Sequence, residues 1–153
     1  MTLALPLLAV LLLAGDALDV RAGRALERLC PCPAGDVACA GQHLRAARAI
    51  GAVAPDAEGA ISLIGIGCHE SRFAVVHEQG GRRRAVTWWQ IEVPVAQRAA
   101  LLADDALAAR TALAARGHGL QSYACGGSCP EKAAELARSE AAARWAWNRL
   151  ASP

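Results

Sequence analysis

Glu70 is the residue of this sequence that is best placed for acid–base chemistry. It follows the apolar run Ile61–Cys68, which predicts a buried helix, with a buried strand as the alternative. Burial beside apolar groups raises the pKa of a carboxyl because it penalises the charged form. A Glu with an ordinary pKa of about 4.3 is ionised near neutral pH. One with a raised pKa can protonate the leaving oxygen of a glycosidic bond. The alternative interpretation is that Glu70 only begins the solvated end of a helix.

Three short motifs that include Glu70 follow one another along the chain. In this order they resemble the motifs Glu-Ser-x-aromatic, Gly-x-x-Gln-Ile and Tyr-Asn-x-Gly of the soluble lytic transglycosylases and goose-type lysozymes. The resemblance covers residues 57–150 and implies a lysozyme-like fold. The motifs are His69-Glu70-Ser71-Arg72-Phe73, Ala85-Val86-Thr87-Trp88-Trp89-Gln90-Ile91 and Tyr123-Ala124-Cys125-Gly126.

The resemblance gives roles to four residues. It implies that Glu70 is the catalytic acid and base and that Ser71 supports it. It also implies that Gln90 and Tyr123 lie in the glycan-binding cleft, with Tyr123 beside the acid. The implied reaction is cleavage of the β-1,4 bond between N-acetylmuramic acid and N-acetylglucosamine, without a metal or an organic cofactor.

Two residues depart from the family motifs. Thr87 stands where the family has Gly, so we expect a different backbone turn there. Ala124 stands where the family has Asn, which removes one polar group from the cleft. These departures support a second hypothesis, in which the chain is a non-catalytic exported helical module that binds peptidoglycan or a partner protein.

The product of the implied reaction depends on the number of carboxylates. Family enzymes often work with one carboxylate, and the sugar's own 6-hydroxyl can then attack to leave a 1,6-anhydro end. A pair of carboxylates predicts ordinary hydrolysis. Glu78 and Glu92 are the nearest candidates for a second carboxylate, although each is more typical of a surface residue.

Trp88 and Trp89 are candidates for contact with the glycan. If their segment is extended, the two side chains point to opposite faces. This predicts that one ring packs in the core while the other stacks on a sugar ring.

The elements that must position these residues are mostly helical, because Ala, Leu, Arg and Glu predominate while aromatic residues make up only 4% of the chain. The sequence therefore predicts an α+β fold that is predominantly α-helical. Extended structure is expected only in a segment around residues 77–93. The predicted helices are residues 18–29, a helix capped by Asp36 and stopped by Gly51, residues 57–76, a long helix from Pro94 to Gly117, and a helix after a capping box at Ser128–Glu131 that runs to about Leu150.

The cysteines and the N-terminus predict export. Residues 1–17 contain an unbroken apolar run, Leu3–Ala14, which is too short to span a bilayer and is typical of a signal peptide. The alternatives are a buried N-terminal helix and a retained membrane anchor. The six cysteines predict disulfides, and their spacing leaves open a local bridge between the last two or a bond from either to Cys68. They are Cys30, Cys32, Cys39, Cys68, Cys125 and Cys129.

The remaining expectations concern partners and location. A zinc site built from Cys30, Cys32, Cys39 and His43 is the alternative to the first disulfides, but its spacing does not match common zinc knuckles. The net charge of +2 does not indicate nucleic-acid binding. We expect residues 18–153 to form one monomeric domain in the periplasm or outside the cell, with peptidoglycan as its partner and no stable membrane insertion.

Overall fold

The computed structural model describes residues 17–73, 85–125 and 129–150, which form a mainly helical α+β structure with one small sheet. This confirms the predicted fold class. The predicted leader lies outside the described residues except for Ala17. Among the described residues no helix is long and apolar enough to cross a membrane. The elements are α2 (Leu18–Leu29), α3 (Val37–Val53), α4 (Ala57–Glu70), β1 (Ala85–Val86), β2 (Ile91–Glu92), α5 (Val95–Ala103), α6 (Asp105–Gly117), α7 (Leu120–Cys125) and α8 (Pro130–Asn148).

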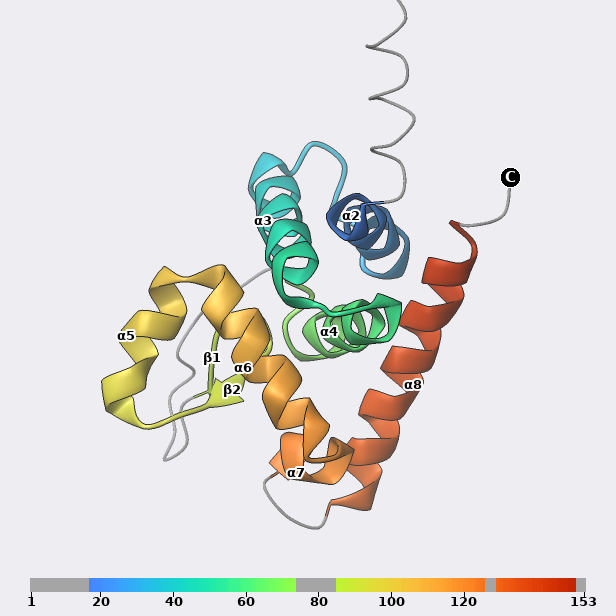
Figure 1. Cartoon of the computed structure of the whole chain (residues 1–153). Coiled ribbons are helices and arrows are strands. Elements are labelled where there is room, and N and C mark those ends of the chain that lie inside the picture. The colour runs from blue at the N-terminus through green and yellow to red at the C-terminus, as the bar shows by residue number, and fades with distance from the viewer. Residues whose placement is uncertain (1–16, 74–84, 126–128, 151–153) are drawn as a thin grey trace, which may run out of the picture.

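Helix α4 lies at the centre of the structure, in contact with α2, α3, α6 and α8 (Figure 1). Asp56 caps its N-terminus by accepting a hydrogen bond of 2.9 Å from the backbone N–H of Gly59. Every residue from Leu63 to Cys68 is buried, which confirms the prediction of a buried helix. The helix that is apolar on most sides is thus the one that other helices surround.

Helix α4 ends at Glu70, so the prediction that it runs to Val76 is wrong. Arg72 and Phe73 adopt left-handed backbone angles, with φ of 53° and 55°, which do not continue an α-helix. The ring of Phe73 then packs back on Gly67, where a Cβ would lie 2.0 Å from the tip of the ring. Residues 74–76 lie outside the described residues.

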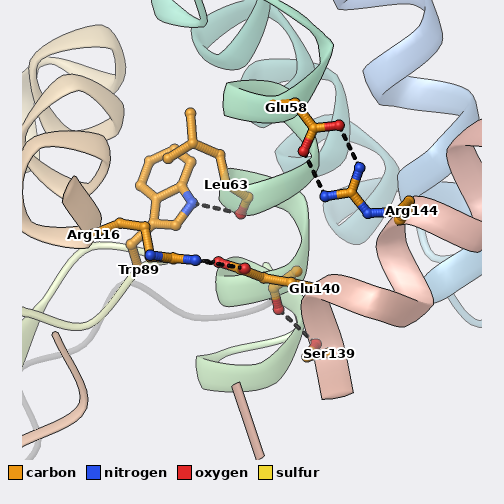
Figure 2. Close-up of polar contacts among 8 residues, drawn as sticks. Glu58, Leu63, Trp89, Arg116, Ser139, Glu140 and Arg144 are labelled. Carbon is orange, nitrogen blue, oxygen red and sulfur yellow. Dashed lines mark hydrogen bonds and ion pairs between the residues drawn. The ribbon is translucent and has the colours of Figure 1, made fainter. Parts of the chain in front are cut away.

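Gly65 lets α8 approach α4 closely. A Cβ at Gly65 would lie 2.7 Å from the Cα of Glu140. At the same crossing the Ser139 hydroxyl donates a 2.7 Å hydrogen bond to the carbonyl of Gly65 (Figure 2). Glu140 also accepts two hydrogen bonds from Arg116 of α6, of 2.6 and 2.9 Å. The crossing of α4 and α8 is therefore linked to α6 as well.

Three other helix boundaries differ from the predictions. Helix α3 continues past Gly51 to Val53, and Gly51 instead makes room for Asp19 of α2. The long helix after Pro94 is two helices, because the side chain of Asp104 accepts a hydrogen bond of 2.9 Å from the backbone N–H of Leu107 and starts α6. The N-cap of α8 is Cys129, without a side-chain capping bond, and Ser128 lies outside the described residues.

The segment that was predicted to be extended contains a two-stranded hairpin. Strands β1 and β2 pair antiparallel, with Ala85 opposite Glu92 and Val86 opposite Ile91. Residues 77–84 lie outside the described residues, so the prediction is confirmed only for the second half of the segment.

Two disulfides join the first half of the fold. Cys30, at the end of α2, is bonded to Cys68 of α4, and Cys32 is bonded to Cys39 of α3. The alternative in which Cys125 or Cys129 bonds to Cys68 is therefore wrong. Cys129 is also in a disulfide, while the side chain of Cys125 lies outside the description. No described cysteine is a free thiol.

Candidate active site

Residues from all three motifs line one cavity of about 420 Å³. Glu70 comes from the end of α4, Gln90 from the turn of the hairpin and Tyr123 from α7. The cavity brings together residues that are up to 54 positions apart in the sequence. The other lining residues are Ala85, Ile91, Glu92, Ala115, His118, Ser122 and Ala124.

Glu70 is exposed as a whole residue because it faces this cavity, and it also lines a smaller one of about 140 Å³. Enough protein nevertheless surrounds its carboxyl that burial raises the pKa. The positive charges of His69 and Lys132 act in the opposite direction and are the smaller effects. Glu70 thus ends its helix in contact with solvent, as the alternative interpretation has it, yet its pKa shifts in the direction that a general acid needs.

Ser71 connects the end of α4 to the hairpin. Its hydroxyl donates a hydrogen bond of 2.7 Å to the carbonyl of Trp88 and accepts one of 3.1 Å from the backbone N–H of Phe73. These bonds fix the chain directly after Glu70.

A tight turn at residues 87–90 presents Gln90 to the cavity. The carbonyl of Thr87 accepts hydrogen bonds from the backbone N–H of Gln90, at 3.1 Å, and from its side-chain amide, at 2.9 Å. Thr87 has a φ of 69°, in the left-handed region that Gly adopts most readily. Position 87 therefore has a backbone conformation that suits the Gly of the family motif, although the β-branched residue Thr87 occupies this position.

Tyr123 lines the cavity from α7 and is hydrogen-bonded directly to the hairpin turn. Its phenol donates a short hydrogen bond to the carbonyl of Trp89. Burial, and secondly the negative charge of Glu70, raise the pKa of Tyr123 above its usual value. The phenol consequently stays protonated and remains a hydrogen-bond donor at the edge of the site.

Both adjacent tryptophans are buried, so the prediction that one of them faces a sugar is wrong. Trp88 is 1% exposed and Trp89 is 0% exposed. They lie in the tight turn instead of in an extended strand, and their rings pack edge-on against each other and around Phe73. Trp89 Nε1 donates a hydrogen bond of 2.9 Å to the carbonyl of Leu63 (Figure 2). Trp88 Nε1 is buried and has no partner among the described residues.

This difference between the two indoles gives a matched pair of variants. Trp89→Phe removes a buried hydrogen bond, whereas Trp88→Phe removes an N–H that has no described partner. We expect Trp89→Phe to lower the free energy of unfolding by about 1 kcal/mol more than Trp88→Phe. Urea unfolding followed by circular dichroism measures both values. Equal losses, or a larger loss for Trp88→Phe, would contradict the assigned bond.

Sequence reasoning did not select His118 and Ser122, which also line the cavity. They lie at the end of α6 and in α7, and α7 was not predicted because six residues are too few to show a helical period. Glu92 is an exposed residue that lines the same cavity as Glu70. Glu78, the other candidate for a second carboxylate, lies outside the described residues.

The raised pKa of Glu70 makes stability depend on pH in a definite direction. Because the folded chain holds this proton more tightly than the unfolded chain, the contribution of Glu70 to stability is complete below the unfolded pKa and is lost as pH rises through the folded pKa. We expect Glu70→Gln to gain stability relative to the native chain as pH rises from about 3 to 7. Urea unfolding of both proteins across this range tests the expectation. A constant difference between them would contradict it.

The left-handed angle of Thr87 predicts a stabilising substitution. A non-Gly residue in this region costs about 1–3 kcal/mol, and Gly costs about 1 kcal/mol of extra chain entropy on folding. We therefore expect Thr87→Gly to be more stable than Thr87→Ala by about 1 kcal/mol. Thr87→Ala is the matched control, because both changes remove the buried hydroxyl that has no described partner. Thermal unfolding ranks the two, and an Ala variant at least as stable as the Gly variant would refute strain at this position.

Comparison with known proteins gives no match to this chain among protein-family models, curated proteins or solved structures.

Proposed function

We propose that this chain cleaves the glycan strands of peptidoglycan between N-acetylmuramic acid and N-acetylglucosamine, with Glu70 as general acid and base. The observation that carries the proposal is the single cavity lined by Glu70, Gln90 and Tyr123. These residues belong to the three motifs that resemble those of lytic transglycosylases and goose-type lysozymes. The raised pKa of Glu70 adds to the support.

Each residue has a task in this reaction. The Glu70 carboxyl donates its proton to the leaving oxygen as the glycosidic bond breaks, and the resulting carboxylate then accepts a proton from the attacking hydroxyl. Gln90 keeps a side-chain oxygen that can accept a hydrogen bond from a sugar, because its amide nitrogen is bonded to Thr87. Tyr123 and Ser71 fix the hairpin turn relative to α4 through the carbonyls of Trp89 and Trp88.

The attacking hydroxyl is either water or the sugar's own 6-hydroxyl. Glu92 lines the same cavity and gives a specific reason to consider ordinary hydrolysis by two carboxylates. A Glu92→Gln variant distinguishes the cases, since it would slow hydrolysis but would leave release of a 1,6-anhydro product nearly unchanged.

We further propose that the protein acts outside the cytoplasm as a monomer. Stable disulfides form mainly in oxidising compartments, and described cysteines in both halves of the chain are in disulfides. Peptidoglycan lies in such a compartment.

The test is digestion of purified sacculi by the mature chain, with the released muropeptides identified by mass spectrometry. Release of disaccharide fragments with reducing or 1,6-anhydro ends would support the proposal. Binding to sacculi without release would instead support the non-catalytic module, for which Ala124 is the specific observation, because it leaves the cavity without the Asn of the family motif.

A further inference from the structure

The Cys32–Cys39 disulfide adjoins a buried histidine. Cys39 and His43 are one turn apart on α3, so their side chains share a face of the helix. Cys32 Sγ lies 3.5 Å from His43 Nδ1, and Cys39 Sγ lies 3.9 Å from His43 Nε2. The three potential ligand atoms lie within 4.8 Å of one another.

His43 is poorly satisfied in this position. Its side chain is 5% exposed, and its polar contacts within the described part of the chain are the two disulfide sulfurs. Sulfur is a weak hydrogen-bond acceptor, and a buried imidazole usually has a stronger partner. The remaining neighbour identified for its ring is Phe73, in an edge-on contact. Each ring nitrogen thus has one sulfur as its polar neighbour, and either nitrogen could be a metal ligand once the sulfurs are thiolates.

One of the two sulfur–nitrogen distances already fits zinc. With Zn–S bonds of about 2.3 Å and Zn–N bonds of about 2.0 Å, tetrahedral geometry separates sulfur from nitrogen by about 3.5 Å. Cys32 Sγ is 3.5 Å from His43 Nδ1, whereas the 3.9 Å contact of Cys39 Sγ is to the other ring nitrogen, Nε2. Zinc binding therefore requires the two sulfurs to separate and to face the same nitrogen, and Cys32 lies in the segment between α2 and α3, outside any helix.

An apolar cavity of about 360 Å³ between α2 and α3 gives access to this cluster. Cys32 and His43 line it, together with two acidic residues, Asp19 and Glu27, and two basic residues, Arg24 and Arg48. A metal ion could therefore enter from solvent, and a water molecule could occupy its fourth position.

We propose that Cys32, Cys39 and His43 form a zinc site when their disulfide is reduced, so that the disulfide and the zinc site are alternative states of the same residues. A dithiol reductant breaks the S–S bond, giving two thiols here and one disulfide in the reductant. Zn²⁺ then replaces the two thiol protons, which are released to solvent, and the neutral imidazole supplies the third ligand. This inference is independent of the proposed glycan cleavage.

The experiment begins with mild reduction of the purified protein by a water-soluble phosphine under argon. Cys30 and Cys68 are 4% and 9% exposed, whereas Cys32 and Cys39 are more accessible, so the Cys32–Cys39 bond should open before the Cys30–Cys68 bond. Alkylation and peptide mass spectrometry identify the opened bonds, and circular dichroism reports the fold. The reduced protein is then titrated with Zn²⁺, and with Co²⁺, whose thiolate-to-metal charge-transfer absorption detects sulfur ligation.

We expect one metal ion per reduced chain and none in the oxidised chain. His43→Gln should weaken metal binding at least about tenfold, because even removal of a group that only supports a ligand has this effect. The double variant Cys32→Ser/Cys39→Ser retains the other cysteines and should show no binding. Equal binding by His43→Gln, binding by the double variant, or no binding by the reduced native chain would overturn the proposal. A reduced chain that unfolds and is not refolded by Zn²⁺ would also overturn it.

Discussion

Glu70→Gln is expected to slow muropeptide release from purified sacculi by about 10²–10⁴-fold, the usual contribution of general acid catalysis. The amide keeps the size of the side chain but cannot donate a proton to the leaving oxygen. The fold should be retained, because the site already disfavours a charge at this position. Mass spectrometry of the released fragments measures the rate and identifies the ends.

Glu58→Gln is the matched control for this variant. Glu58 lies at the other end of the same helix and forms an exposed ion pair with Arg144, which contributes little to stability (Figure 2). It should release muropeptides at nearly the native rate. If Glu70→Gln does the same, Glu70 is not the acid, and the resemblance to the lytic enzymes does not extend to mechanism. If the native chain releases nothing, the non-catalytic module becomes the better hypothesis.

Removal of the Cys30–Cys68 disulfide is expected to have the largest effect on stability. This bond closes a loop with a sequence separation of 38, compared with 7 for Cys32–Cys39. Loop-closure entropy predicts a loss of about 4 kcal/mol for the longer loop and about 2.5 kcal/mol for the shorter one. We therefore expect Cys30→Ala/Cys68→Ala to unfold at lower urea concentration than Cys32→Ala/Cys39→Ala.

Burial adds to this difference, because Cys30 and Cys68 are in the core while the other pair is half-exposed. Each double variant removes two sulfurs, so the comparison isolates loop length and burial. The pairing of the cysteines would have to be reconsidered if the variant of the shorter loop were the less stable one.

The sequence correctly predicts helices that have a strong apolar pattern. It mispredicts the end of a helix where tertiary contacts determine that end. The apolar run before Glu70 predicts a buried helix, and α4 is one. Its end depends on the ring of Phe73 packing on Gly67, a contact that no local pattern shows. The break at Asp104 had a local signal, since Asp is a preferred N-cap, but the surrounding Ala-rich periodicity concealed it.

The sequence also predicts only part of the candidate site. Motif order placed Glu70, Gln90 and Tyr123 together, and they line one cavity. The alternation argument failed for Trp88 and Trp89, because it assumes a strand whereas these residues occupy a turn, where successive side chains can lie on the same side.

The close crossing of α4 and α8 has a consequence for how the protein is made. Ser139 and Glu140 of α8, which cover Gly65, follow it in the sequence by 74 and 75 positions and are therefore synthesised after α4. Until α8 has been translated, the backbone of the central helix has an exposed face, so the helix that carries Glu70 cannot reach its final packing. The surroundings of Glu70 are therefore completed only after α8 has emerged from the ribosome.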